Sequence, residues 1–198
     1  MTIENLIKAV PPPAQPYEAF SGPWEPVEAE LGAVLPGDYK EFSRLYGSGI
    51  FMEFLSINTP RSENPHARIE YQARLFHHFH SNHEDFIYAI WPNRGGVILI
   101  ADTYNGDSIF WIPTGPAETW KILVWGRGYG SFEVFDCDLT DFLAGLATGR
   151  LAPREFPDDM LPCDEFFRPY TGSPAQDDSR SNREADEDGE RSGPGTSD

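Results

Sequence analysis

Apolar residues recur at helical spacing in the first half of the chain. Val27 and Leu31 are four positions apart, which predicts a short helix over residues 24–33. A second helix is predicted after Pro36, and Asn64 followed by a proline is typical of a third helix start. The apolar stripes of these two helices are Tyr39, Phe42, Leu45 and Tyr46, and then Ile69, Ala73 and Phe76. Between them, residues 50–57 are predicted as a strand.

The apolar pattern changes to the strand period after residue 85. Short segments rich in β-branched and aromatic residues follow at 86–91, 97–101, 108–112, 120–125 and 132–135. Asn105-Gly106 between two of them indicates a type I′ hairpin turn. Because short turns join successive strands, we expect an antiparallel meander. Residues 97–100 are apolar on both faces, which favours a central strand.

A last helix is predicted after Asp138, which is placed to cap it, with Asp141 in its first turn. Its apolar stripe consists of Leu139, Phe142, Leu143, Leu146 and Ala147. Gly149 stands where a glycine commonly ends a helix. The order of elements predicts an α+β fold, with a mostly antiparallel sheet of about six strands covered by helices.

The distribution of proline and of large apolar residues divides the chain into three parts. Residues 1–23 are rich in proline and are predicted to form a flexible arm without helix or sheet. Residues 24–170 hold the aromatic residues and are predicted to form a single domain. Residues 171–198 contain eight acids, three arginines and no large apolar residue, which predicts a disordered acidic tail.

The net charge of −17 restricts the classes of partner. It argues against nucleic acid and against anionic membrane surfaces, since both attract clustered Lys and Arg. It suits a basic protein partner, although acidity also keeps a protein soluble without any partner. The two cysteines lie far apart, and no signal peptide or long apolar run is visible. These features predict a cytoplasmic protein.

A search for catalytic or metal-binding patterns identifies only weak candidates. The histidines at 77, 78, 80 and 83 have a spacing that could bind zinc, but a solvated helix end explains them better. Cys137 precedes a helix, yet no base is linked to it, and no GxSxG motif occurs. We therefore predict no metal, no cofactor and no enzymatic activity.

Two turns carry the polar and aromatic residues that we consider for binding. Residues 102–107 superficially resemble a calcium loop, but the order of ligands is wrong and the hairpin explains them. Residues 126–130 alternate glycine with Arg127 and Tyr129 and are predicted as a flexible hairpin loop rather than a phosphate loop. Side chains at such tips are available to a partner.

Taken in order, several motifs resemble the SUKH superfamily, also called the Smi/Knr-type family. The resemblance covers residues 24–150. Its motifs are Trp24, Glu30–Gly32, Leu35–Phe42 with Tyr46–Gly49, Asn105-Gly106-Asp107 with Trp111, Trp120–Ile122 and Leu139–Leu143. The resemblance implies an α+β fold and a non-catalytic, protein-binding role. Bacterial members are immunity proteins that bind and block a cognate toxin, often a nuclease, and fungal relatives are regulatory interaction proteins in cell-wall signalling.

The resemblance and the acidity together predict an immunity protein that neutralises a basic toxin domain by direct binding. The alternative is a regulatory or scaffolding module for an endogenous partner. The partner-binding residues we expect are Asp102, Tyr104, Asp107, Arg127 and Tyr129. The oligomeric state is left open.

Overall fold

The computed structural model describes residues 3–81, 85–128 and 130–171. The helices of this part are α1 Glu4–Ala9, α2 Glu25–Leu31, α3 Gly37–Leu45, α4 Ile69–His80 and α5 Leu139–Ala147. Its strands are β1 Gly49–Phe51, β2 Leu55–Ile57, β3 Ile98–Thr103, β4 Ser108–Ile112, β5 Lys121–Gly126, β6 Ser131–Phe135 and β7 Phe167–Pro169. Short 3-10 turns occur at Pro65–Ala67 and Ala117–Thr119. The predicted acidic tail lies outside the described residues.

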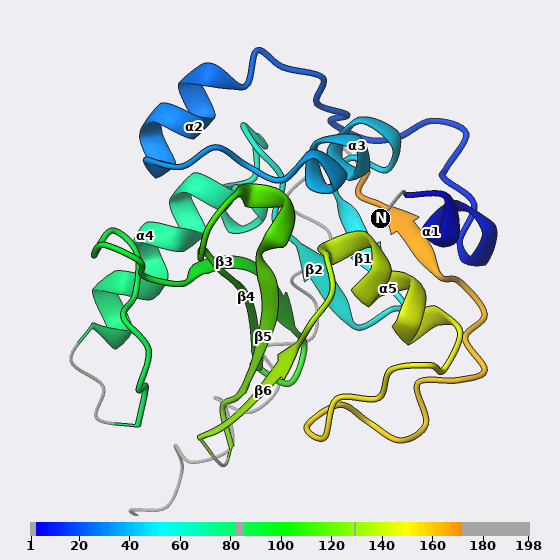
Figure 1. Ribbon diagram of the computed structural model, residues 1–198. Coiled ribbons are helices and arrows are strands. Elements are labelled where there is room, and N and C mark those ends of the chain that lie inside the picture. The colour runs from blue at the N-terminus through cyan, green and yellow to red at the C-terminus, as the bar shows by residue number, and fades with distance from the viewer. Residues whose placement is uncertain (1–2, 82–84, 129, 172–198) are drawn as a thin grey trace, which may run out of the picture.

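The described strands form one antiparallel sheet in the order β6-β5-β4-β3-β2-β1-β7. This confirms the predicted α+β class with helices around a mainly antiparallel sheet (Figure 1). The predicted central strand is also confirmed, because β3 lies in the middle of the order. Among the described helices, none is long and apolar enough to cross a membrane.

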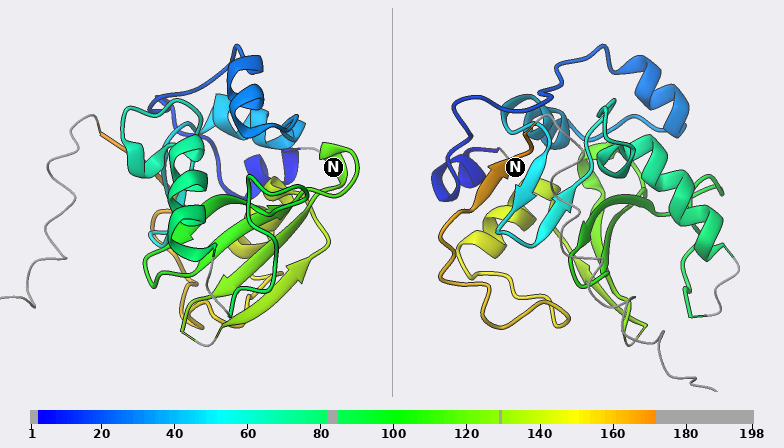
Figure 2. Two further views of the ribbon diagram at one scale, coloured as in Figure 1. Left: turned by 90° about the vertical axis from the view of Figure 1, so that its left-hand side faces the viewer. Right: turned by 180° about the vertical axis from the view of Figure 1, so that it is seen from behind.

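The two faces of the sheet bury two different cores, and α4 and α5 lie on opposite sides of the sheet (Figures 1 and 2). On β4, Ile109 and Trp111 point into the main core with α3 and α5, whereas Phe110 points into the second core. The second core consists of Phe76, Phe86, Ile90, Val97, Leu99, Phe110, Leu123 and Trp125. The alternation follows from the two-residue period of a strand.

Two of the predicted strands are wrong. Residues 50–57 form a hairpin rather than one strand, because Met52 and Glu53 adopt positive φ values of 51° and 53° and turn the chain. Residues 86–91 form no strand, and their β-type pairing is limited to the isolated bridge between Ile90 and Val97. Their alternating pattern reflects burial of Phe86 and Ile90 in the second core, with Ile87 exposed.

Residues 3–23 pack against the body of the protein and include helix α1, contrary to the expectation of an arm without helix or sheet. Helix α1 packs against α5 and buries Leu6 completely. The Tyr46 hydroxyl donates a 2.6 Å hydrogen bond to the Val10 carbonyl, and Ser48 donates its backbone N–H to the Tyr17 carbonyl. The proline count misled the prediction because α1 ends before the first proline.

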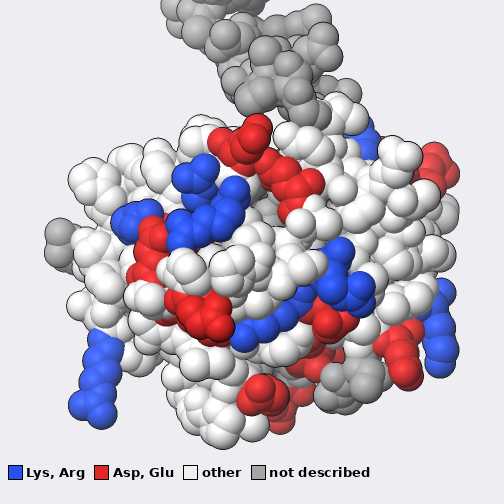
Figure 3. All heavy atoms as spheres, turned by 90° about the horizontal axis from the view of Figure 1, so that it is seen from above, with Lys and Arg blue, Asp and Glu red and all other residues white. Residues whose placement is uncertain are grey.

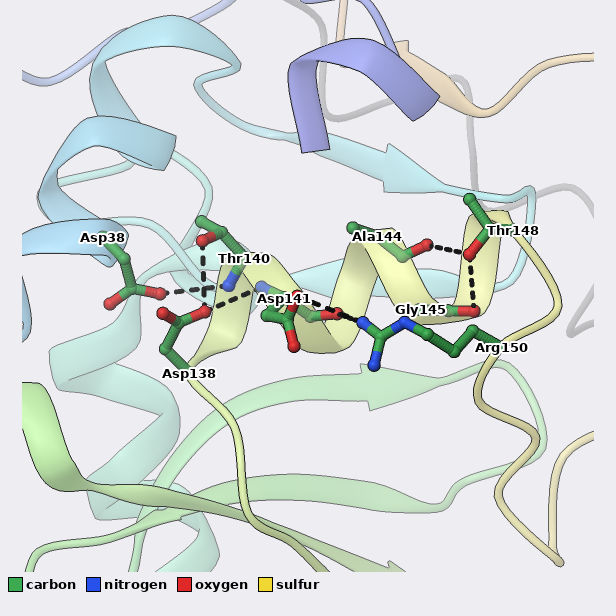
Figure 4. Close-up of polar contacts among 8 residues, drawn as sticks. All are labelled: Asp38, Asp138, Thr140, Asp141, Ala144, Gly145, Thr148 and Arg150. Atoms are coloured by element: carbon green, nitrogen blue, oxygen red, sulfur yellow. Dashed lines mark hydrogen bonds and ion pairs between the residues drawn. The ribbon is translucent and has the colours of Figure 1, made fainter. Parts of the chain in front are cut away.

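Helix α5 is capped twice at its N-terminus (Figure 4). The Asp138 carboxylate accepts the Asp141 N–H at 2.7 Å, which confirms the predicted cap. The Asp38 carboxylate, from the first turn of α3, accepts the Thr140 N–H at 3.0 Å. Gly149 has a φ of +70°, as a glycine that ends a helix requires. The second cap ties α3 to α5 across the main core.

Candidate functional site

The two turns that carry the expected partner-binding residues lie side by side at one end of the sheet. In the β3–β4 turn, the Thr103 carbonyl accepts the Gly106 N–H, and Gly106 has a φ of +88°. Asn105 does not share a positive φ, so the predicted type I′ turn is wrong in detail. The loop is a type I turn followed by a glycine, which is common in three-residue hairpins.

Asp107 connects the two turns. Its carboxylate accepts the Thr103 hydroxyl at 3.0 Å and the Arg127 backbone N–H at 3.2 Å. Only 5% of Asp107 is exposed. Its position makes it part of the framework that holds the β3–β4 and β5–β6 turns together, rather than a contact residue.

We expect Asp107→Ala to lower the free energy of unfolding by about 1–2 kcal/mol, because it leaves two donors without their acceptor. Urea unfolding would measure the change. Asp107→Asn keeps one acceptor oxygen and should cost less. Equal stability of the alanine variant and the wild type would contradict this framework role.

A groove of about 510 Å³ opens between α4 and the second face of the sheet. It is lined by Gln72, Leu75, Phe76, Phe79, His80, Leu99, Asp102, Gly106, Ser108, Trp125 and Arg127. One wall, the α4 wall, consists of Gln72, Leu75, Phe76, Phe79 and His80, and the floor is the row of residues that crosses β3, β4 and β5. Concave sites with mostly apolar walls and a few polar groups are typical of binding sites.

Asp102 is the acidic group of this groove. Its register pairs it with Ser56 on β2 and with Ser108 on β4. The Ser108 hydroxyl donates to the Asp102 carboxylate at 3.0 Å, and Ser56 shares a 2.8 Å hydrogen bond with the Tyr170 hydroxyl. Burial raises the pKa of Asp102 to about 6. The carboxylate therefore lies in a polar row that crosses the sheet beside apolar walls.

Large side chains are exposed around the groove. On α4, 66% of Phe79 is accessible and Tyr71 is exposed as well. On the β3–β4 turn, 60% of Tyr104 is accessible. Tyr71, Leu75 and Phe79 follow one another at intervals of four positions, so they share one side of the helix. Exposed aromatic residues beside a groove are favoured contact residues in protein interfaces.

The structure thus brings four of the five expected residues to one end of the sheet, in three different roles. Asp102 and Arg127 line the groove, Tyr104 is exposed on the adjoining turn, and Asp107 is buried beneath it. Tyr129 lies outside the described residues. The α4 wall was not among the predicted site residues, although Tyr71, Leu75 and Phe79 recur at intervals of four and were a signal for it.

The histidines and Cys137, which the sequence suggested for metal binding or catalysis, have surroundings that are explained by packing and burial. His80 stacks on Phe76 with ring centroids 4.2 Å apart, and His78 packs edge-on against Phe79. Within the described residues, no group of three or more His, Cys, Asp or Glu side chains is arranged to hold a metal ion. His83 lies outside them. Burial raises the pKa of Cys137 to about 12, which disfavours the reactive thiolate.

Comparison with protein families supports the resemblance noted in the sequence. The family model SUKH_6, described as SMI1-KNR4 cell-wall, matches residues 23–143. The chain therefore belongs to the SMI1-KNR4 family of the SUKH superfamily. No curated protein and no solved structure matches it.

The motifs that carry the family resemblance form the framework of the fold. Tyr39 is fully buried, packs edge-on against Trp111 at 4.9 Å and donates its hydroxyl to the Asn58 carbonyl. Asp38 caps α5, and Asp107 joins the two turns. The residues of the family motifs therefore hold the architecture together.

Proposed function

We propose that this protein is an immunity protein that neutralises a cognate toxin by binding it directly, without catalysis. The observation that carries the proposal is the SUKH family match over residues 23–143. The open groove with exposed aromatic side chains beside it supplies a surface suited to a protein partner. We propose this surface, with Tyr104, Phe79, Asp102 and Arg127, as the contact region.

The charge distribution supports a basic partner, such as a nuclease toxin. The whole chain carries −17, and the tail accounts for −5 of it, so residues 1–170 carry −12. An acidic protein approaches a phosphate-binding cleft rapidly because opposite potentials steer the encounter. A partner of this class acts in the cytoplasm, where we also place this protein.

The face seen from above is less suited to a basic partner, because cations lie beside acids over much of it (Figure 3). Glu30 pairs with both Arg61 and Arg74, and Glu28 pairs with Lys40 at 2.6 Å. These pairs connect α2 to α3 and α4. Because the charges there are already paired, we place the partner at the groove.

The alternative is a regulatory or scaffolding module for an endogenous partner. The description of the matched family as a cell-wall family favours it. The two functions share the binding surface but differ in whether the partner is toxic.

Co-expression with the product of an adjacent gene tests the proposal. We expect rescue of growth, and a one-to-one complex that weakens steeply as salt rises, since opposite charges hold it together.

Tyr104→Ala should weaken the complex by about tenfold or more, as loss of an interface aromatic residue does. Val134→Ala, at an exposed site on β6, is the matched control. Absence of rescue, together with a complex between the chain and a host protein, would favour the regulatory module.

A further inference from the structure

We propose that the groove between α4 and the sheet receives an arginine side chain of the partner protein, whose guanidinium pairs with Asp102. This inference rests on the proposed function, because it specifies one anchor residue of the protein that binds there. Asp102 would then contact the partner directly, and the apolar and aromatic side chains of the α4 wall would pack against the arginine side chain.

The carboxylate of Asp102 lacks a positive partner in the described part of the chain. It is held by the Ser108 hydroxyl, and none of the ion pairs between described residues includes it. A partly buried carboxylate without a cation is costly, and an incoming cation with good geometry removes much of that cost. Burial raises the pKa of Asp102, which means that the ionised carboxylate is poorly solvated there, and a neighbouring positive charge would stabilise it.

The walls favour arginine over other cations. Leu75 and Leu99 line the path of the aliphatic stem, and the exposed ring of Phe79 supplies an aromatic surface in the same groove. A guanidinium is planar, weakly hydrated and suited to stacking on aromatic rings while it donates to a carboxylate. A volume of about 510 Å³ is sufficient for one such side chain.

Arg127 lies at the edge of the same groove and carries the same positive charge as the incoming arginine. Its side chain lies close to Gly106, where an added Cβ would be 3.2 Å from the guanidinium nitrogen. Its backbone is fixed by Asp107, whereas its side chain is exposed. An arginine entering the groove is therefore repelled by Arg127, and removal of that side chain should strengthen binding.

The test is an NMR titration of the full chain at pH 7 with N-acetyl-argininamide, up to about 50 mM because a single side chain binds in the millimolar range. We expect saturable shifts at Asp102, Leu75 and the Trp125 indole. N-acetyl-citrullinamide, which has the same shape without the charge, should leave these signals in place. Asp102→Asn should weaken binding at least about tenfold, and Arg127→Ala should strengthen it severalfold. Asp136→Asn, an exposed acid on another edge, is the matched control.

Two results would overturn the inference: shifts that are the same for the citrulline and arginine compounds, or saturable shifts that map away from the groove.

Failure of the arginine site is distinguishable from failure of the proposed function. If the toxin complex and growth rescue survive Asp102→Asn unchanged, the arginine site is wrong and the immunity function stands. If argininamide saturates at Asp102 but no toxin is bound, the site stands and the immunity function is wrong.

Discussion

Replacing Leu6 with alanine is expected to lower the free energy of unfolding by about 2–5 kcal/mol. The Leu6 side chain is completely buried between α1 and the main core, and α1 packs against α5. Removing three buried carbon atoms loses their transfer free energy and leaves a cavity. Urea or thermal unfolding of the purified variant measures the effect.

Two control variants define what the Leu6 result means. Asn5→Ala changes an exposed residue of the same helix and should alter stability by less than about 0.5 kcal/mol. Truncation after residue 171 removes no large apolar residue and should leave the unfolding transition in place. If Leu6→Ala were as mild as Asn5→Ala, the first helix would not be part of the folding unit.

The N-terminal segment also shows where sequence patterns are insufficient. A helix of six residues has too few positions for a periodic stripe, and its stability comes from contacts with α5. The β7 strand was missed for a similar reason, since three residues pair with the β1 edge after a long connection. Strong local signals did predict α3, α5 and the meander, because cap, stripe and turn residues all agreed there.

The candidate site was predictable only in part. The hairpin signal located Asp102, Tyr104 and Asp107 at the tip of a turn, but it could not distinguish a buried framework carboxylate from one in a groove. That distinction depends on the β5–β6 turn, whose backbone N–H at Arg127 reaches Asp107. The α4 wall came into the site through tertiary packing, since the fold brings α4 and Asp102 of β3 to one groove although they lie far apart in the sequence.

The free energy of unfolding is expected to fall as pH rises from about 4 to 6.5, and Asp38 is one cause. Burial, together with the nearby Asp138 carboxylate, raises the pKa of Asp38 to about 6 from an ordinary value of 3.8. Between these values the folded protein keeps its proton while the unfolded chain releases it, so ionisation favours unfolding. A shift of this size corresponds to about 1–3 kcal/mol, lost through this range and fully lost above pH 6.

Comparison of two Asp38 variants separates the charge from the cap. Asp38→Asn keeps an oxygen for the Thr140 N–H but cannot ionise, so its stability should vary less with pH and exceed that of the wild type at pH 7. Asp38→Ala also loses the pH dependence, yet it leaves that N–H without its acceptor and should be less stable than the asparagine variant by about 1 kcal/mol. Urea unfolding at pH 4, 5.5 and 7 measures all three proteins. An asparagine variant with the same pH slope as the wild type would show that other carboxylates, Asp102 among them, cause the loss of stability.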